Sequence, residues 1–301
     1  MASPKILIRE LRAEFLTASV IPILVAVAIA RYETGSWSPG LFILTIAGAV
    51  LLHLGTNTAN DYFDHLSGAD EANVDYARPF TGGTRLIQDG LLSPREVLTL
   101  SITLFAGALI VGIFLIIARG WFILALGLIG LFLGYFYTAP PVKLAHRGLG
   151  EIAVGIGYGL IPVGAYFVQT GHVSLPIIIA AIPMALLVTG IIVINEFQDY
   201  RGDMSAGKRT LVVRLGRKKS VVLFASIMIA AYIPVIAGVS MDLIPRLTLI
   251  SLLSIILAAK AIITASKRFD DPAGLVPANG ATILSHALTG LLLATAWLLS
   301  G

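Results

Sequence analysis

Two short polar stretches carry the residue types in this chain that could do chemistry, and each follows a long apolar segment. Each holds one asparagine and two aspartates, spaced i, i+4, i+7 in the first and i, i+4, i+8 in the second: Asn57, Asp61 and Asp64, then Asn195, Asp199 and Asp203. On a helix, either spacing places the three side chains on one face. The sequence therefore predicts two helices that each end in a stripe of one amide and two carboxylates.

Carboxylate and amide oxygens alone suit a hard cation, above all Mg²⁺, which is usually completed by substrate phosphates. Cations in the neighbouring loops would hold the remaining phosphate oxygens, and the candidates are Lys143, Arg147, Lys208 and Arg209. The chemistry indicated is the departure of a diphosphate whose tail extends among the helices. The alternatives are two solvated helix ends, and cations that only anchor the loops.

The elements that position these stripes are predicted to be membrane helices. Of the 301 residues, 57% are hydrophobic and 13% are charged, whereas a soluble domain carries about 25% charged residues. This composition predicts a polytopic membrane protein, and nothing in it suggests nucleic-acid binding. The chain has no cysteine, which excludes disulfides, thiolate catalysis and zinc–thiolate sites.

Nine apolar segments are predicted to cross the membrane: residues 15–30, 41–55, 98–118, 121–137, 149–170, 174–194, 221–239, 245–265 and 282–299. The second segment has 15 residues, which is short of the ~20 that a spanning helix needs. Its helix is therefore expected to continue through residues 57–61, which places the first stripe at the membrane face.

Positive charges are distributed unevenly between the two sides of this predicted domain. With the N-terminus inside, 17 of the 21 lysines and arginines fall in inner segments and three fall in outer connections. Cytoplasmic segments carry such an excess of positive charge. We therefore expect a multi-pass protein of the cell membrane whose N-terminus and stripe-bearing loops, residues 64–97 and 204–220, are cytoplasmic. Loops of this length are usually functional or disordered.

The two stretches also carry a family resemblance. Asn60-Asp61-x-x-Asp64, and Asp199-x-x-x-Asp203 with Lys208 behind it, resemble the two aspartate-rich motifs of the UbiA superfamily of intramembrane prenyltransferases. The similarity covers nearly the whole chain, with the motifs after the second and sixth of nine spans. Within the superfamily, three segments resemble the 1,4-dihydroxy-2-naphthoate prenyltransferases of menaquinone synthesis: residues 77–88, 147–151 and 206–211. One departure is that the third acid of the first motif, Asp70, comes six residues after Asp64 rather than four.

The resemblance implies a fold, a reaction and a set of site residues. The fold is a single all-α domain over residues 1–301, with nine helices around a central cavity and a cytoplasmic cap. The reaction is Mg²⁺-dependent transfer of a polyprenyl group from its diphosphate to an aromatic acceptor, with the four aspartates of the motifs as the catalytic and metal-binding acids. The residues implied to bind Mg²⁺–diphosphate are Asn57, Asp61, Asp64, Asp199 and Asp203, with Asn195 in support. The cations implied to hold phosphate oxygens are Lys143, Lys208, Arg85 and Arg147.

Three further residues are expected to contact the substrates. Tyr135 and Tyr137 would shield an allylic cation through cation–π contact, although interfacial tyrosines also serve as membrane anchors. Arg12, at the inner end of the first span, would orient an acceptor carboxylate, unless it pairs with the nearby Glu14 instead.

Two other functions remain open from the sequence. The acceptor could be geranylgeranylglyceryl phosphate, which would give an archaeal-type ether lipid precursor, and residues 60–64 do not separate this lipid acceptor from an aromatic one. Alternatively, the chain could be a secondary transporter, because its two motif-bearing halves hint at an internal repeat. Against a transporter, the acids cluster at one face, with no matching polar entry on the outer side.

Overall fold

The chain forms a bundle of helices in the computed structural model, which describes residues 3–301, and no strand occurs among these residues. Eight helical segments are long and apolar enough to cross a membrane: α2 (Thr17–Thr34), α3 (Pro39–Ser67), α5 (Pro94–Arg119), α7 (Gly150–Thr170), α8 (Leu175–Ser205), and the ranges Arg217–Ser240, Arg246–Arg268 and Ala273–Leu299. A ninth apolar helix, α6 (Trp121–Tyr135), has 15 residues. The predicted all-α multi-pass membrane fold is confirmed, with one segment shorter than a full span.

The three C-terminal spanning segments are composite. They consist of α10 (Arg217–Ala230) with α11 (Ile233–Ser240), η3 (Arg246–Ser254) with α12 (Ile255–Arg268), and η4 (Ala273–Leu275) with α13 (Val276–Leu299). The predicted segment 221–239 is therefore broken rather than continuous. Pro234 lies in the first turn of α11, and a proline has no N–H with which to continue the preceding helix.

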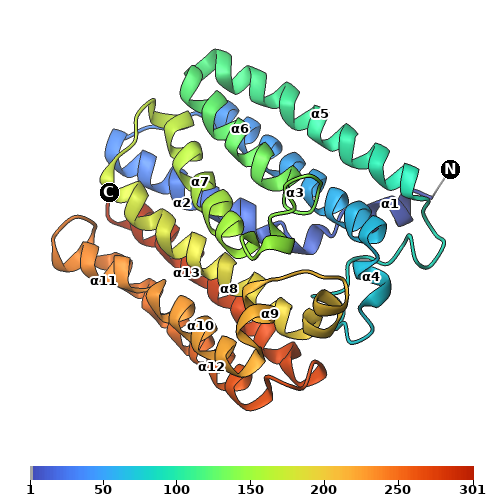
Figure 1. The fold of residues 1–301 in the computed structure, drawn as a ribbon. Coiled ribbons are helices and arrows are strands. Elements are labelled where there is room, and N and C mark those ends of the chain that lie inside the picture. Colours follow the sequence, from blue (N-terminus) through green and yellow to red (C-terminus); the bar gives the residue numbers. More distant parts are fainter. Residues whose placement is uncertain (1–2) are drawn as a thin grey trace.

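Neighbouring helices pack along the bundle, α3 against α5, α7 against α8, and α13 against α2 (Figure 1). Glycines bring α3 and α5 close together, because Gly48 faces Val111 and Gly107 faces Leu51. Small residues at such contacts are typical of helix pairs in membranes. Large apolar side chains such as Phe114 on α5 remain exposed on the outside of the bundle, as expected for a surface in contact with lipid.

Both stripe-bearing helices continue beyond their predicted apolar segments. Helix α3 has 29 residues and α8 has 31, which corresponds to about 44 and 46 Å at 1.5 Å per residue. The hydrocarbon core of a membrane is about 30 Å thick. The prediction that the second helix includes residues 57–61 is therefore confirmed, and both stripe-bearing helices are longer than the hydrocarbon core is thick.

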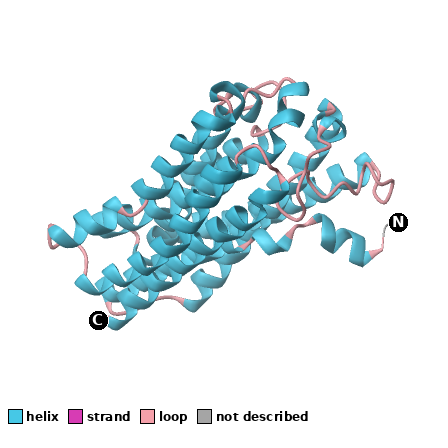
Figure 2. Cartoon of the chain, turned by 90° about the horizontal axis from the view of Figure 1, so that it is seen from below, coloured by secondary structure: helices cyan, strands magenta, loops and turns pink. Residues whose placement is uncertain are grey.

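The two stripes lie at the same end of the bundle, together with α1 (Pro4–Glu10), α4 (Ala69–Ala72) and α9 (Leu211–Leu215) (Figure 1). Figure 2 shows the long loops at the end that holds the N-terminus. The loop after α3 is anchored there by a small apolar cluster, in which Leu86, Leu92 and Val97 pack against Ile6 and Leu7 of α1. The loop and α1 therefore pack together at this end of the molecule.

A cavity of about 520 Å³ begins at the acidic end and extends between α2, α3, α5, α6, α7 and α8. Its deeper wall is apolar, with Leu52, Leu115, Ile123 and Leu133 among the lining residues. The main buried core lies beside the cavity and is built from α2, α7, α8 and the C-terminal helices. The bundle thus encloses an apolar space that ends at the two acidic stripes.

Candidate functional site

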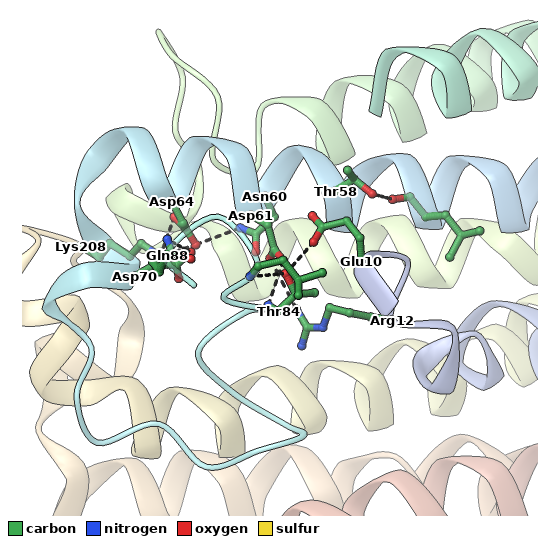
Figure 3. A network of polar contacts seen from close by, with 12 residues as sticks. Glu10, Arg12, Thr58, Asn60, Asp61, Asp64, Asp70, Thr84, Gln88 and Lys208 are labelled. Atoms are coloured by element: carbon green, nitrogen blue, oxygen red, sulfur yellow. Dashed lines mark hydrogen bonds and ion pairs between the residues drawn. The ribbon is translucent and has the colours of Figure 1, made fainter. Parts of the chain in front are cut away.

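The first acidic stripe lies on the last turns of α3. Asn57, Asn60 and Asp64 line the cavity, and Asn60 Nδ2 donates a hydrogen bond to Asp64 Oδ2 at 3.2 Å. Asp61 lies beneath the loop that follows α3, where its Oδ2 accepts a hydrogen bond of 3.0 Å from the backbone N–H of Thr84. Figure 3 shows Asn60, Asp61 and Asp64 on α3, with Thr84 beside Asp61 and Lys208 beside Asp64.

The second carboxylate oxygen of Asp61, Oδ1, is buried and accepts no hydrogen bond among the described residues. The guanidinium of Arg12 lies 3.9 Å from it. Gly83 adopts a φ of +63°, and a Cβ at that position would lie 3.1 Å from Oδ1. A glycine is therefore required here by its backbone conformation, and it leaves Oδ1 free of a covering side chain. A buried carboxylate oxygen without a donor fits a ligand for a bound cation.

The second acidic stripe lies on α8, and all three of its predicted members, Asn195, Asp199 and Asp203, line the cavity. Asp199 Oδ1 accepts a hydrogen bond of 2.6 Å from Asn73 Nδ2, which belongs to the loop after α3. Asn195 Oδ1 accepts a hydrogen bond of 2.8 Å from Asn279 Nδ2 on α13. The loop of one stripe therefore holds a carboxylate of the other.

Lys208 joins the two stripes. Its Nζ lies 2.9 Å from both carboxylate oxygens of Asp64 and 3.7 Å from Asp203 Oδ1. Burial by itself would lower the pKa of this ammonium, but Asp64 and Asp203 outweigh burial and raise its pKa above the ordinary value. The lysine therefore stays charged and neutralises the carboxylates that face each other across the cavity.

The donor set fits Mg²⁺ rather than a softer metal, because the side chains that face one another across the cavity are carboxylates and amides. Among the described residues, no three acidic or histidine side chains lie close enough to form a complete metal cluster. Lys208 occupies the space between Asp64 and Asp203. Since substrate phosphates commonly complete the coordination of Mg²⁺, two stripes joined by a lysine suit a metal that is bound together with a diphosphate.

Two further buried acids lie beside the first stripe. Burial, followed by the negative charge of Asp64, raises the pKa of Asp70 to about 8. Burial, followed by the charge of Asp61, likewise raises the pKa of Glu10 to about 8, and Glu10 Oε2 accepts a hydrogen bond of 2.6 Å from Thr84 Oγ1. Burial therefore favours the protonated form of both acids, which limits the negative charge at this end.

Several predicted phosphate ligands do not reach the cavity wall. Arg85 Nη1 donates to the backbone oxygen of Asp70 at 2.8 Å, and Arg147 Nη2 donates to that of Pro141 at 3.0 Å. The side chain of Lys143 forms no hydrogen bond or ion pair with the described part of the chain. None of these three cations lines the cavity, so their phosphate-binding role stays a prediction and Lys208 is the predicted cation that lies at the site.

Of the three residues predicted to contact the substrates, two line the cavity and one does not. Tyr137 and Arg12 line the cavity. Tyr135 does not, and packs edge to face against Phe63 with ring centroids 5.7 Å apart. Within residues 3–301, Arg12 forms its ion pair with Asp61 rather than with Glu14. The structure therefore brings Arg12 and Tyr137 to the site and leaves Tyr135 among apolar neighbours.

Sequence reasoning missed three groups at this site. Asn73 and Thr84 hold Asp199 and Asp61, but they come from an irregular loop, whose residues have no periodic spacing relative to the stripes. His53 also lines the cavity. It precedes Asn57 by four residues, so the same i, i+4 rule could have found it.

Comparison with known proteins gives a consistent result. The model of the UbiA prenyltransferase family matches residues 19–275. The 1,4-dihydroxy-2-naphthoate octaprenyltransferase of Bacillus subtilis is 29% identical over 226 residues, which cover 75% of this chain and 70% of that protein. The 2-carboxy-1,4-naphthoquinone phytyltransferase of Synechocystis is 26% identical over 297 residues, covering 98% of this chain and 94% of that protein.

A solved structure shares the fold. The UbiA homologue from Archaeoglobus fulgidus bound to GPP and Mg²⁺ aligns with a TM-score of 0.70 at 18% identity, covering 96% of this chain and 98% of that one. The arrangement of helices around the cavity is therefore that of a known membrane fold.

Proposed function

Because the chain belongs to the UbiA prenyltransferase family, and is therefore a membrane prenyltransferase, we propose that it transfers a polyprenyl group from its diphosphate to 1,4-dihydroxy-2-naphthoate. The observation that carries this proposal is an apolar cavity that ends at two acidic stripes, with Lys208 between them and Arg12 on the same wall. The apolar part suits the prenyl chain, and the charged end suits a diphosphate.

The choice of acceptor is supported by the relatives and by one cation. The Bacillus subtilis and Synechocystis proteins are named for naphthalene acceptors that carry a carboxyl group. Arg12 lies where the apolar wall meets the acidic end, and a guanidinium is well suited to hold a carboxylate in two parallel hydrogen bonds. A flat aromatic acid would thus find both an apolar slot and a cation.

The diphosphate site is proposed to use the residues of both stripes. Asp61, Asp64, Asp199 and Asp203, with Asn57 and Asn195, would hold the metal, and Lys208 would donate to phosphate oxygens. When bound there, Mg²⁺ would neutralise the negative charge that develops on the diphosphate. Lys208 lies between the stripes already charged, so its contribution requires little rearrangement.

The transfer itself breaks the bond between C1 of the prenyl chain and the diphosphate oxygen, and the electron pair leaves with the diphosphate. A ring carbon of the acceptor then forms a bond to C1, and the ring releases the proton or the carboxyl group that this carbon carried. Tyr137 lines the same cavity as Asp203 and Glu196, where its ring could face the allylic cation. The apolar walls limit access of water, which would otherwise capture that cation.

The experiment that tests this function incubates purified protein with labelled geranylgeranyl diphosphate and two acceptors in parallel, 1,4-dihydroxy-2-naphthoate and geranylgeranylglyceryl phosphate. We expect a labelled naphthalene product with Mg²⁺ and none with EDTA. Turnover of the lipid acceptor alone would overturn the quinone assignment and support the ether-lipid alternative. Membership in the family already favours either reaction over secondary transport.

We further propose that the acidic end of the bundle faces the cytoplasm, because 17 of the 21 lysines and arginines lie on that side. The chain has no cysteine, so Ser67→Cys and Ser205→Cys each introduce a single label site at this end. We expect both to resist a membrane-impermeant thiol reagent in sealed cells, while Ser36→Cys, at the opposite end, is labelled. Labelling of Ser67→Cys or Ser205→Cys from outside would reverse the orientation.

Removal of the guanidinium that is proposed to hold the acceptor should change acceptor binding selectively. For Arg12→Ala we expect the KM for 1,4-dihydroxy-2-naphthoate to rise by about 10- to 100-fold, as for a lost hydrogen bond to a charged group. The KM for prenyl diphosphate should change much less. Arg9→Ala, an exposed arginine of α1, is the matched control and should leave both constants within about twofold. Equal increases in both constants for Arg12→Ala would place the arginine at the metal site instead.

A further inference from the structure

Three helices place a buried polar cluster in the wall of the cavity, deeper than the acidic stripes. It consists of Ser19 on α2, His53 on α3 and Tyr158 on α7, and all three side chains line the cavity. Ser19 Oγ lies 2.6 Å from His53 Nδ1, and Tyr158 Oη lies 3.2 Å from the same nitrogen. Neither the metal site nor the diphosphate site uses these residues.

The two hydroxyl groups define how the imidazole can bind a ligand. A neutral imidazole carries its hydrogen on one nitrogen and accepts with the other. The contacts of Nδ1 with the hydroxyls of Ser19 and Tyr158 fit either tautomer. We assign the hydrogen to Nε2, so that Nδ1 accepts from a hydroxyl. Among the described residues, no group is hydrogen-bonded to His53 Nε2. This N–H is therefore available to a molecule in the cavity.

Other polar side chains on the same length of α3 are already satisfied. Thr45 Oγ1 donates to the backbone oxygen of Leu41, and Thr56 Oγ1 donates to that of Leu52. The cluster at His53 differs from them, because its hydrogen bonds are to side chains of two other helices and Nε2 has no partner among the described residues. Nε2 of His53 is also not enclosed by protein, unlike Nε2 of the buried His286, so a molecule in the cavity can reach it.

The position of His53 relative to the stripes identifies the kind of ligand. It precedes Asn57 by one helical turn, or about 6 Å along α3, so a ring bound beside it would lie next to the proposed diphosphate site. Arg12 lines the same cavity, and Tyr158 places its ring edge to face with His53 at 5.8 Å. This part of the wall thus combines aromatic surface, a cation and one neutral donor.

We propose that the Nε2–H of His53 donates a hydrogen bond to a ring oxygen of the aromatic acceptor, while Arg12 holds its carboxylate. This inference rests on the proposed function and assigns an additional residue to its acceptor. Two contacts at separate points of a flat ring fix its orientation, which decides the ring carbon that meets C1 of the prenyl chain. Donation to the ring oxygen also favours its more negatively charged form, which makes the ring a better nucleophile.

The test is a comparison of ligands in binding, which needs neither Mg²⁺ nor prenyl diphosphate. The dissociation constants of 1,4-dihydroxy-2-naphthoate and of 2-naphthoate, which lacks both ring oxygens, are measured with purified protein under reducing conditions. We expect the wild-type chain to prefer the dihydroxy compound by about tenfold, the usual size of one well-placed hydrogen bond. In His53→Leu this preference should fall to about twofold or less, while affinity for 2-naphthoate stays nearly constant.

A conservative variant and a control keep the result interpretable. His53→Gln retains an N–H donor and should recover part of the preference, whereas His172→Leu, which removes a histidine at the opposite end of the bundle, should keep all of it. If His53→Leu does not fold, Tyr158→Phe and Ser19→Ala serve instead. Each removes one hydroxyl that contacts His53 Nδ1, and each should lower the preference for the dihydroxy compound by about two- to threefold.

The outcomes separate this inference from the proposed function. If the wild-type chain prenylates dihydroxynaphthoate but His53→Leu keeps the full preference, the role of His53 is overturned and the function stands. If the wild-type chain neither binds nor prenylates dihydroxynaphthoate, both are overturned. A loss of preference in His53→Leu together with its partial recovery in His53→Gln supports the assignment.

Discussion

Prenyl transfer is expected to fall by about 10²- to 10³-fold when Asp61 or Asp199 is replaced by asparagine. Each substitution removes one anionic oxygen from the proposed Mg²⁺ site, and a metal that stabilises developing charge contributes several kcal/mol to the rate. Mg²⁺ has few protein ligands in any one site, so the remaining carboxylates cannot fully replace the lost one. The effect should appear mainly in kcat/KM for the prenyl diphosphate.

The fold should survive both substitutions. Asp199 Oδ1 accepts from Asn73, and Asp61 Oδ2 accepts from the Thr84 backbone, and an asparagine oxygen can take over either role. The change also removes a buried negative charge. We therefore expect the midpoint of thermal unfolding, measured without metal, to stay within a few degrees of the wild-type value or to rise.

The measurement is transfer of label from geranylgeranyl diphosphate over a range of Mg²⁺ concentrations. Asp89→Asn is the matched control, because Asp89 lies in the loop that contacts Asp61 but is exposed and faces Arg78 at 3.7 Å. This variant should keep activity within about twofold. Near-normal turnover in Asp61→Asn or Asp199→Asn would reject a site built from both stripes.

Replacing Lys208 by methionine should have a double effect, on stability and on activity. The ammonium lies 2.9 Å from Asp64 and 3.7 Å from Asp203, so its loss leaves two buried carboxylates without a cation. Removing one partner of a buried ion pair typically costs about 3–5 kcal/mol. Because Lys208 is also the proposed phosphate ligand between the stripes, kcat/KM for prenyl diphosphate should fall by about 100-fold or more.

The response to Mg²⁺ distinguishes a specific role of Lys208 between the stripes from general destabilisation of the fold. Mg²⁺ binds the folded site and stabilises it by mass action, and it can partly replace the missing positive charge. Added Mg²⁺ should therefore raise the unfolding midpoint of Lys208→Met more than that of the wild-type protein, while activity stays low. Lys218→Met, an exposed lysine at the start of α10, is the control and should behave as wild type. Equal metal responses in all three proteins would argue against a role for Lys208 between the stripes.

The sequence by itself determined the parts of this protein that depend on neighbours along the chain. Asn57 and Asp64 lie on one helix, so their spacing alone predicts a shared face, and the short apolar segment before them predicts that α3 continues through residues 57–61. The same reasoning predicts the second stripe on α8, and the separate apolar segments predict nine membrane helices, of which α6 is shorter than a full span. These inferences hold because helix geometry and membrane thickness act on local sequence.

Only the tertiary structure decided which groups meet from separate segments. Thr84 and Asn73 return from an irregular loop to hold Asp61 and Asp199, and Lys208 reaches Asp64 across 144 residues. Arg85, which the sequence marks as a phosphate ligand, instead holds loop carbonyls. An arginine looks the same in the sequence whether it binds a phosphate or a backbone oxygen. The path of the loop determines which of the two it contacts, and no periodic pattern in the sequence encodes that path.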